Sequence, residues 1–178
     1  MSAGIATSKA GELGDSADAL VQRLAGKYMT FKLAEEVYGF EILKVRELIG
    51  LMQITRMPRM PDFLRGVINL RGKVFPVIDL RLKFGMPPAE STDHTVIIVI
   101  QCQVAGRLLT MGVLVDQVIE VLAIDAGKIA PKPDLGDASF DDSFILGVGK
   151  TAERVVFLLD IGRVLSAEEG QALAEAAA

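Results

Sequence analysis

The chain has 178 residues, of which 51% are apolar and 24% charged, a composition that predicts a globular protein with a packed interior. Its 19 Lys and Arg residues are outnumbered by 23 Asp and Glu residues, and the net charge of −4 excludes a fold-wide basic field that would attract nucleic acid. The single cysteine, Cys102, excludes a disulfide within the chain, and the single histidine, His94, leaves no ordinary zinc site.

The segment 1–27 differs in composition from the rest of the chain. It is rich in Ala, Gly, Ser and Asp without sustained periodicity, so we expect a flexible leader with one helical turn near positions 17–24. The leader lacks the apolar core of a secretory signal, and the longest apolar run, Val96–Ile100, is too short to cross a bilayer. These features predict a soluble, cytoplasmic protein.

From Tyr28 onward, short runs rich in β-branched and apolar residues are bounded by Gly, Pro, Asn and Asp, a pattern typical of strands joined by turns. A short helix is expected over residues 80–84 because Gly85 and two prolines follow it, and a helical tail over residues 167–178 begins behind Ser166, a suitable N-cap. The sequence therefore predicts an all-β fold with short helices, and its strands are expected at residues 29–33, 38–42, 67–70, 74–78, 95–102, 108–115 and 155–159.

Two blocks of sequence recur in the same order. "GFEILKVRELI" aligns with "GVLVDQVIEVL", which places Gly39 on Gly112. "FLRGVINLRGKVFPVIDL" aligns with "FILGVGKTAERVVFLLDI", which places Phe63 on Phe144. We interpret the two blocks as an internal duplication, and about 60 residues per copy suits a small closed barrel, since closure removes exposed strand edges.

The two copies differ in a polar cluster. Glu47 and Asp79 recur as Glu120 and Asp160, so we expect them to serve turns or caps that both copies need. By contrast, three polar residues of the first copy are replaced in the second. Arg65, Asn69 and Arg71 align with Leu146, Lys150 and Ala152. The architecture does not require that cluster, which points to function.

The residues that usually carry catalysis do not form a pattern in this chain. The paired carboxylates are neighbours in polar segments and cannot converge on a substrate as an acid and a base must. No Gly-x-Gly-x-x-Gly or Gly-Lys-Ser/Thr loop is present to hold a phosphate, and Cys102 lies within a predicted strand. The sequence therefore predicts a protein without enzymatic activity.

A basic segment remains to be explained, because seven Lys and Arg residues fall between Arg56 and Lys83. Small barrels that bind single strands stack bases on aromatic side chains, and only Phe63, Phe75 and Phe84 are near, with no Trp in the chain. A single-strand nucleic-acid-binding barrel is therefore a weaker hypothesis than a surface that binds protein.

The same segment predicts a hairpin with its tip at residues 69–72, because Gly66 and Gly72 permit turn conformations that other residues avoid. Pro76 interrupts the second strand of the hairpin. Since proline donates no ladder hydrogen bond, it places this strand at an edge or a bulge. Two interpretations of that edge stay open: it offers backbone to a partner, or the proline blocks aggregation there.

At this point the chain resembles a known family, the CheW family of bacterial chemotaxis coupling proteins. The resemblance rests on "YGFEILKVRELIG", "ITRMP", "FLRGVINLRGKVFPVIDLR", "HTVIIVI", "MGVLVDQVIEVL" and "LDIGRVL", which occur in the order of the family. It implies a CheW-like domain over residues 28–166, built of two packed SH3-like five-stranded β-barrels. We expect barrel one at about 30–90 and barrel two at about 92–165, the latter with a contribution from the strand near residue 28.

The resemblance also implies a role without catalysis and without a cofactor. Such proteins bridge the cytoplasmic tip of transmembrane methyl-accepting chemoreceptors to the regulatory domain of the histidine kinase CheA, in arrays on the inner face of the membrane. By motif, the receptor-binding residues would be Val45, Glu47, Leu48, Asn69, Arg71 and Val96, and Gly66 would be a kinase-binding position. We further expect Glu47 to pair with Arg71, so that the carboxylate orients the guanidinium. A related adaptor that controls an output other than swimming is the alternative that the sequence leaves open.

Overall fold

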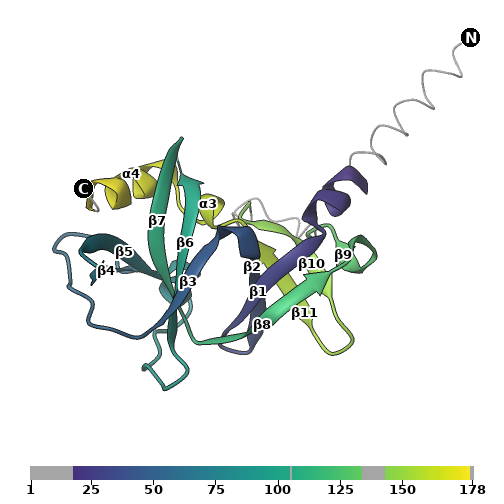
Figure 1. Ribbon diagram of the computed structural model, residues 1–178, viewed down its shortest axis with the longest axis horizontal. Coiled ribbons are helices and arrows are strands. Elements are labelled where there is room, and N and C mark those ends of the chain that lie inside the picture. Colours follow the sequence, from purple (N-terminus) through teal and green to yellow (C-terminus); the bar gives the residue numbers. More distant parts are fainter. Residues whose placement is uncertain (1–17, 105, 134–142, 177–178) are drawn as a thin grey trace, which may run out of the picture.

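A computed structural model describes residues 18–104, 106–133 and 143–176, and within them the fold consists of two packed β-sheets with short helices (Figure 1). The predicted all-β class is confirmed. In chain order the elements are β1 (Gly26–Leu33), β2 (Glu36–Glu41), η1 (Ile42–Lys44), β3 (Val45–Gly50), β4 (Leu64–Leu70), β5 (Lys73–Asp79), α2 (Leu80–Lys83), β6 (Val96–Val104), β7 (Arg107–Val115), β8 (Gln117–Ile124), η2 (Ala126–Lys128), β9 (Ile129–Ala130), β10 (Ile145–Lys150), β11 (Val155–Leu159), α3 (Ile161–Val164) and α4 (Ala167–Ala176).

The strands divide into two sheets. Sheet A has the order β8-β1-β2-β11-β10-β9, in which β9 contributes only two residues, and sheet B has the order β3-β6-β7-β5-β4. The segment that follows β3 lies against the far edge of sheet B, because Thr55 and Val67 exchange backbone hydrogen bonds of 2.8 and 2.9 Å. In sheet A the same position is filled by β9, where Ala130 pairs with Val148.

The duplication inferred from the sequence is present in the pairing of the strands. In sheet B, β5 runs parallel to β7 with Val77 opposite Gly112, and in sheet A, β11 runs parallel to β2 with Leu158 opposite Gly39. These are equivalent positions of the two aligned blocks. The hairpins β4–β5 and β10–β11 also share a register shift at the equivalent glycines. Both blocks therefore describe one repeated architecture.

The two copies nevertheless do not each form a sheet of their own. The hairpin β1–β2 of the first copy joins strands β8 to β11 of the second, and the hairpin β6–β7 of the second copy joins strands β3 to β5 of the first. The sheets therefore do not follow the expected boundaries at about 30–90 and about 92–165, because the copies exchange their first hairpins. The expected contribution of the strand near residue 28 is part of this exchange.

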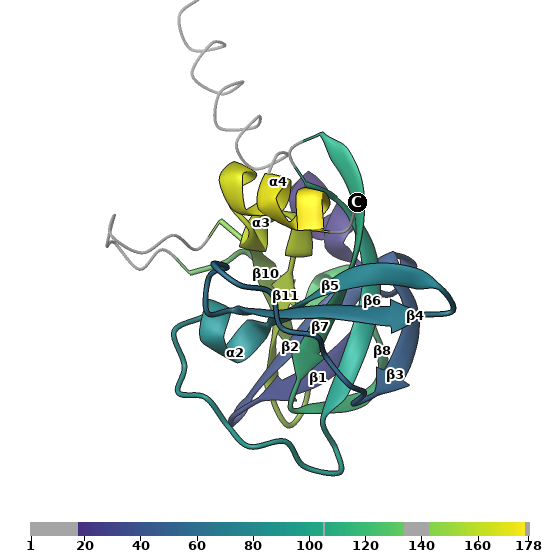
Figure 2. The same ribbon diagram turned by 90° about the vertical axis from the view of Figure 1, so that its left-hand side faces the viewer.

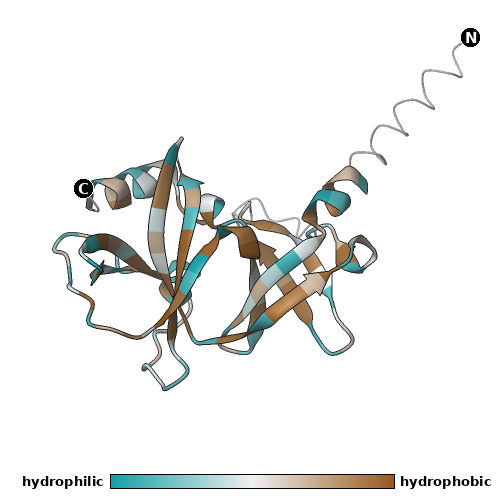
Figure 3. Ribbon diagram, in the orientation of Figure 1, coloured by the Kyte–Doolittle hydropathy of each residue, from teal (hydrophilic) through white to brown (hydrophobic). Residues whose placement is uncertain are grey.

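Apolar clusters within and between the sheets hold the fold together. The strands of both sheets contain many apolar residues (Figure 3). One cluster lies within sheet A and includes Tyr28 and Leu158, and one lies within sheet B and includes Ile68 and Ile97. The largest joins the sheets and contains residues of both, among them Phe31, Phe40, Ile78, Ile98 and Met111. Burial of this apolar surface provides the main driving force for the packing of one sheet on the other.

Within the described residues, the N-terminal segment is more ordered than the sequence suggested. Residues 18–24 are helical, as expected, and Leu24 is buried against sheet A, so the predicted flexible leader is wrong for residues 18–27. Residues 1–17, the rest of that leader, lie outside the described residues.

The helical tail is confirmed as α4, which lies beside α3 (Figure 2). Ser166 caps α4 as expected, since the Glu169 N–H donates to Ser166 Oγ at 3.1 Å. In return, the Glu169 carboxylate accepts from the Ser166 N–H at 2.9 Å. This reciprocal capping box explains why the helix begins behind the serine.

Candidate protein-binding surface

The turn between β4 and β5 has the expected position and an unusual backbone. Arg71 and Gly72 both adopt positive φ, 54° and 81°, which is the requirement of a two-residue hairpin turn that matches the twist of its strands. Asn69 supports the turn, because its Oδ1 accepts a hydrogen bond from the Gly72 N–H at 3.1 Å. The turn thus sets the direction in which the Arg71 side chain leaves the sheet.

Arg71 forms the expected ion pair with Glu47 of β3. Its two terminal nitrogens donate to the two carboxylate oxygens, each at 3.0 Å. The hydrogen bonds to Glu47 raise the pKa of Arg71, which remains a cation. The expectation that Glu47 serves a turn or a cap is wrong, since it lies within β3 and its partner belongs to another hairpin.

The apolar members of the predicted receptor set lie on the other face of sheet B. Leu48 is opposite Ile98 and Gly50 is opposite Val96 across the β3–β6 ladder, so Leu48 and Val96 share a face. Val45 and Val96 pack against the apolar cluster between the sheets. Since alternate residues of a strand point to opposite faces, Glu47 lies on the face away from Leu48. The predicted residues therefore gather around one strand, β3, but on two faces of it.

Because β3 pairs only with β6 among the described strands, it forms an edge of sheet B. Leu48 is 42% exposed at this edge. The Glu47–Arg71 pair lies on the opposite face of the same strand. A partner that covers the edge would therefore reach both the leucine and the ion pair.

Gly66, the predicted kinase position, is buried and holds two segments together. Its φ is 142°, and a Cβ at this position would lie 2.0 Å from the carbonyl oxygen of Thr55. Only glycine allows the segment after β3 to approach β4 this closely. An effect of Gly66 on a partner would therefore pass through the segment that it seats, rather than through contact of its own.

That segment borders a hollow of about 1080 Å³, which lies between residues 54–65, α2 and Pro88. Its lining combines cations with flexible apolar side chains, namely Arg56, Met57, Arg59, Met60 and Arg65. Arg56 and Arg59 are exposed, and neither forms an ion pair within the described part of the chain. Such a surface suits an acidic or mixed protein surface with apolar contacts.

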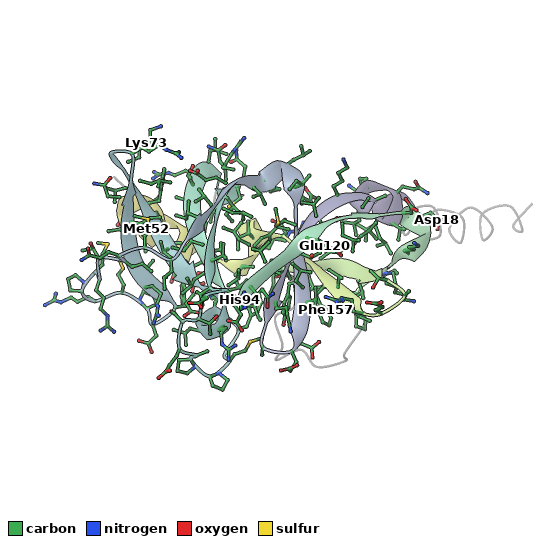
Figure 4. The ribbon with its side chains drawn as sticks, turned by 60° about the horizontal axis from the view of Figure 1, so that its bottom comes forward. Asp18, Met52, Lys73, His94, Glu120 and Phe157 are labelled. Atoms are coloured by element: carbon green, nitrogen blue, oxygen red, sulfur yellow. The ribbon has the colours of Figure 1, made fainter. Side chains whose placement is uncertain are left out.

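The seven cations of the basic segment do not form one patch. Four of them are ion-paired with carboxylates on other elements: Arg65 with Asp79, Arg71 with Glu47, Arg81 with Asp116, and Lys83 with Glu169. Lys83 also lies 4.6 Å from the centre of the Phe63 ring, and Lys73 projects from the end of the molecule opposite Asp18 (Figure 4). A phosphate backbone would have to compete with these internal carboxylates, which argues against binding of nucleic acid.

Asp79 and Asp160 cap short helices, as the repeat suggested. Asp79 accepts hydrogen bonds from the N–H groups of Arg81 and Leu82, and Asp160 accepts one from Gly162. The equivalence extends to the backbone, because the Asp79 N–H donates to the Phe63 carbonyl and the Asp160 N–H donates to the Phe144 carbonyl.

Among the ion pairs that sequence reasoning missed are Arg81–Asp116 and Lys83–Glu169. Their members lie 35 and 86 positions apart in the chain. No spacing rule for helices or hairpins brings residues at such separations together, so the sequence carried no signal for either pair.

The groups that could carry chemistry are separate in the described ranges. They contain no cluster of three His, Cys, Asp or Glu side chains placed to hold a metal ion. Burial raises the pKa of the Cys102 thiol to about 11, so little of the reactive thiolate forms near neutral pH. Within residues 18–104, 106–133 and 143–176, none of the helices has the length and apolar character needed to span a membrane.

Comparisons with known proteins identify relatives of this chain. The family model described as the CheW-like domain matches residues 27–169. The chemotaxis protein CheW of Klebsiella aerogenes is 39% identical over 156 residues, which cover 85% of this chain and 91% of that protein. The chemotaxis protein CheW of Rhizobium meliloti is 37% identical over 144 residues, covering 81% and 90%.

Structural similarity leads to the same family. The crystal structure of the scaffolding protein TtCheW from Thermoanaerobacter tengcongensis superposes with a TM-score of 0.71 at 34% identity, covering 82% of this chain and 97% of that one. Protein FrzA of Myxococcus xanthus is also similar in sequence, at 28% identity over 162 residues, which cover 90% of this chain and 98% of that protein.

Proposed function

The chain belongs to the CheW family of chemotaxis coupling proteins, and we propose that it links the cytoplasmic tip of methyl-accepting chemoreceptors to the regulatory domain of the histidine kinase CheA. It performs this role by binding both partners, without catalysis and without a cofactor. In this proposal the protein works in receptor arrays on the inner face of the membrane and contacts the membrane only through the receptors.

The observation that carries the receptor half of the proposal is the Glu47–Arg71 pair beside the free edge of β3. A helical hairpin tip can place apolar side chains against Leu48, while its polar groups meet the oriented guanidinium of Arg71. The turn holds Arg71 in place before the partner arrives, which lowers the entropic cost of binding. Val45, Asn69 and Val96 support this surface from β3, β4 and β6.

The kinase half of the proposal rests on the hollow beside Gly66. The regulatory domain of CheA would contact the segment that Gly66 seats, with its apolar groups on Met57 and Met60 and its acidic groups beside Arg56 and Arg59. The two halves use different borders of sheet B, so both partners can bind the same molecule. That is the requirement of a coupling protein.

An adaptor for a receptor pathway with another output is the second candidate, which the sequence leaves open. It would use the same surfaces, and only the identity of the receptor separates the two candidates. The hypothesis of a nucleic-acid-binding barrel has less support, because four of the seven cations that suggested it are paired internally.

The test of the receptor surface is Arg71→Ala in the full chain. We expect binding of a receptor tip fragment, measured by calorimetry, to weaken at least about 10-fold, the effect typical of an arginine at the centre of an interface. The melting temperature should change little, because the Arg71 side chain is 75% exposed. Arg154→Ala, in the turn of the equivalent hairpin in sheet A, is the matched control and should bind as the wild type does.

The kinase surface is tested separately with Arg56→Glu. Binding of the CheA regulatory domain should weaken while binding of the receptor tip stays unchanged, and Lys150→Glu, an exposed cation on β10, should alter neither. Failure of the wild-type chain to bind either fragment would contradict the adaptor function. Salt-dependent binding of an oligonucleotide, with no protein binding, would support the nucleic-acid alternative instead.

A further inference from the structure

The chain crosses between the two sheets at two equivalent places, and the two crossovers differ. The first runs from β2 of sheet A to β3 of sheet B through η1, and the second runs from β7 of sheet B to β8 of sheet A through Asp116 alone. The alignment of the first pair of repeat blocks, which sets Gly39 on Gly112, places Leu43 on Asp116. One crossover therefore carries a carboxylate where the other carries an apolar side chain.

Asp116 joins three segments. Its Oδ2 accepts hydrogen bonds from the backbone N–H of Ala34, at 2.8 Å, and from Nη1 of Arg81, at 2.5 Å. Its own N–H donates to the carbonyl of Lys32 at 3.1 Å. Ala34 lies in the β1–β2 turn of sheet A with a φ of 55°, whereas Arg81 belongs to α2, which continues β5 of sheet B. The carboxylate thus connects elements of both sheets at the point where the chain passes between them.

Arg81 is itself held in place. Its Nε donates to the carbonyl of Pro87 at 3.2 Å, and its side chain is only 16% exposed. The helix that carries it, α2, is capped by Asp79 at the end of β5, and β5 begins directly after the turn that presents Arg71. The receptor-facing hairpin and the other sheet are therefore connected through a short series of fixed contacts.

The first crossover has no such connection. Leu43 is 84% exposed, and within the described ranges no side-chain hydrogen bond or ion pair ties residues 42–44 to α3. The residue equivalent to Arg81 is Gly162, one position beyond the second repeat block. A Cβ on Gly162 would lie 2.5 Å from the carbonyl oxygen of Gln103, so this position has no room for an arginine.

We propose that Arg81 and Asp116 are positioning residues that fix the angle between the two sheets of this adaptor. The apolar cluster between the sheets holds them together but has little directional preference, because the hydrophobic effect is proportional to area. A charged hydrogen bond is directional, and here it acts at the crossover, close to the axis about which the sheets would turn. Only one of the two crossovers has it in the described part of the chain, so its loss leaves neither crossover fixed.

The test measures the distance between nitroxide labels on the two sheets by pulsed electron resonance. The labels are placed at Lys73→Cys on β5 and Lys150→Cys on β10, both exposed and both outside α2 and the second crossover. Cys102 can be retained, since its residue is only 2% exposed. The distances are recorded for the wild type, Arg81→Gln and Asp116→Asn; the asparagine keeps an oxygen for the Ala34 N–H and removes only the charge.

We expect one narrow distance distribution for the wild type and a broader or shifted one for both variants, with melting temperatures lowered by at most about 4 °C. Arg81→Lys, which keeps the charge, should restore part of the narrow distribution. Arg163→Gln removes an ion pair with Asp160 that lies within one end of α3, and it should resemble the wild type.

Unchanged distributions in a folded Asp116→Asn protein would overturn the proposal, as would equal broadening by Arg163→Gln. If Arg81→Gln does not fold, Asp116→Asn decides the outcome alone. Because no partner is present in this measurement, its result is independent of the receptor and kinase assignments.

Discussion

Sheets A and B have the same architecture. Among the described residues, however, only sheet B has a polar pair suited to recognition of a partner. Glu47 of β3 meets Arg71 of the neighbouring hairpin turn, whereas the equivalent Glu120 of β8 belongs to the copy in which Ala152 replaces the arginine. Figure 4 shows Glu120 in the middle of the molecule, away from Lys73, which begins β5 directly after the turn. A repeated glutamate therefore has two different environments.

The two glutamates share a position beside a register shift, and in sheet A the backbone of Glu120 contacts Thr30 there. Thr30 of β1 lies at a register shift between β1 and β8, and its hydroxyl donates to the Glu120 carbonyl at 2.7 Å and accepts from the Glu120 N–H at 3.2 Å. The equivalent β3–β6 ladder also shifts register, between Val45 and Glu47. The comparison teaches that recurring glycines and capping aspartates maintain the fold, while the pair proposed for recognition needs Arg71, which the first copy alone has.

The largest difference between the copies in the effect of a substitution on stability is expected at the equivalent glycines, Gly66 and Gly147. Gly66→Ala places a Cβ 2.0 Å from a backbone oxygen at a φ unsuited to alanine, so we expect a loss of about 3 kcal/mol or more in the free energy of unfolding. Gly147→Ala meets its nearest atoms at 3.0 Å, and we expect about 1 kcal/mol. Urea unfolding of both variants measures the difference, and equal losses would contradict the structural role of Gly66.

A smaller difference is expected at the capping aspartates. Both aspartates face an arginine, Asp79 at 3.8 Å and Asp160 at 3.4 Å, but the Asp79 side chain is 10% exposed and accepts two backbone N–H bonds, whereas the Asp160 side chain is 24% exposed and accepts one. Asp79→Ala should cost about 2 kcal/mol and Asp160→Ala about 1 kcal/mol, the range found for helix N-caps. Thermal unfolding of both variants measures these losses. A larger loss of stability for Asp160→Ala than for Asp79→Ala would contradict the expectation.

The smallest effect concerns Lys83, whose equivalent in the second copy is the buried Val164. Burial tends to raise the pKa of Glu169, but hydrogen bonds from Lys83 and Ser166 outweigh it and lower the pKa below 4.5. The Lys83–Glu169 pair therefore stabilises the protein fully above pH 4.5, which is the pKa of Glu169 in the unfolded chain. This stabilisation is lost as the pH falls through the lower pKa that Glu169 has in the folded protein.

Glu169→Gln keeps the helix cap and removes the charge, so it isolates the contribution of the ion pair. We expect it to lower the melting temperature at pH 7 by an amount equivalent to less than about 1 kcal/mol, and to have a much smaller effect below about pH 4. Melting curves of the wild type and the variant across this range provide the test. A difference that persists unchanged at low pH would show that the charge is not its cause.

Much of the local structure could be predicted because it depends on neighbouring residues. The hairpin tip at Asn69 to Gly72, the helix after Asp79 and the cap at Ser166 follow from turn and capping preferences within a few residues. The strands β3, β8, β9 and β10 are not among the predicted strands, although all except β9 overlap the repeat blocks. In β3 and β8 most side chains are partly or fully exposed at the edge of a sheet, so the apolar pattern there is weak.

The candidate site could be predicted only in part. Identity of the residues came from the repeat and the resemblance, and the pairing of Glu47 with Arg71 is confirmed. Which face of β3 each residue occupies depends on its register against β6, and the link between Arg81 and Asp116 depends on how the two sheets pack. Neither can be read from spacing along the chain.

The sequence by itself determined the repeat, because two glycines that permit close packing and two aspartates that cap helices must recur wherever the same local geometry recurs. Only the tertiary structure decided how the copies divide into sheets, since the hairpins β1–β2 and β6–β7 bury the same kind of apolar face in either sheet. That choice places Asp116 and Leu43 at the two crossovers. A polar contact there joins residues 35 positions apart, and it exists only once both sheets are packed.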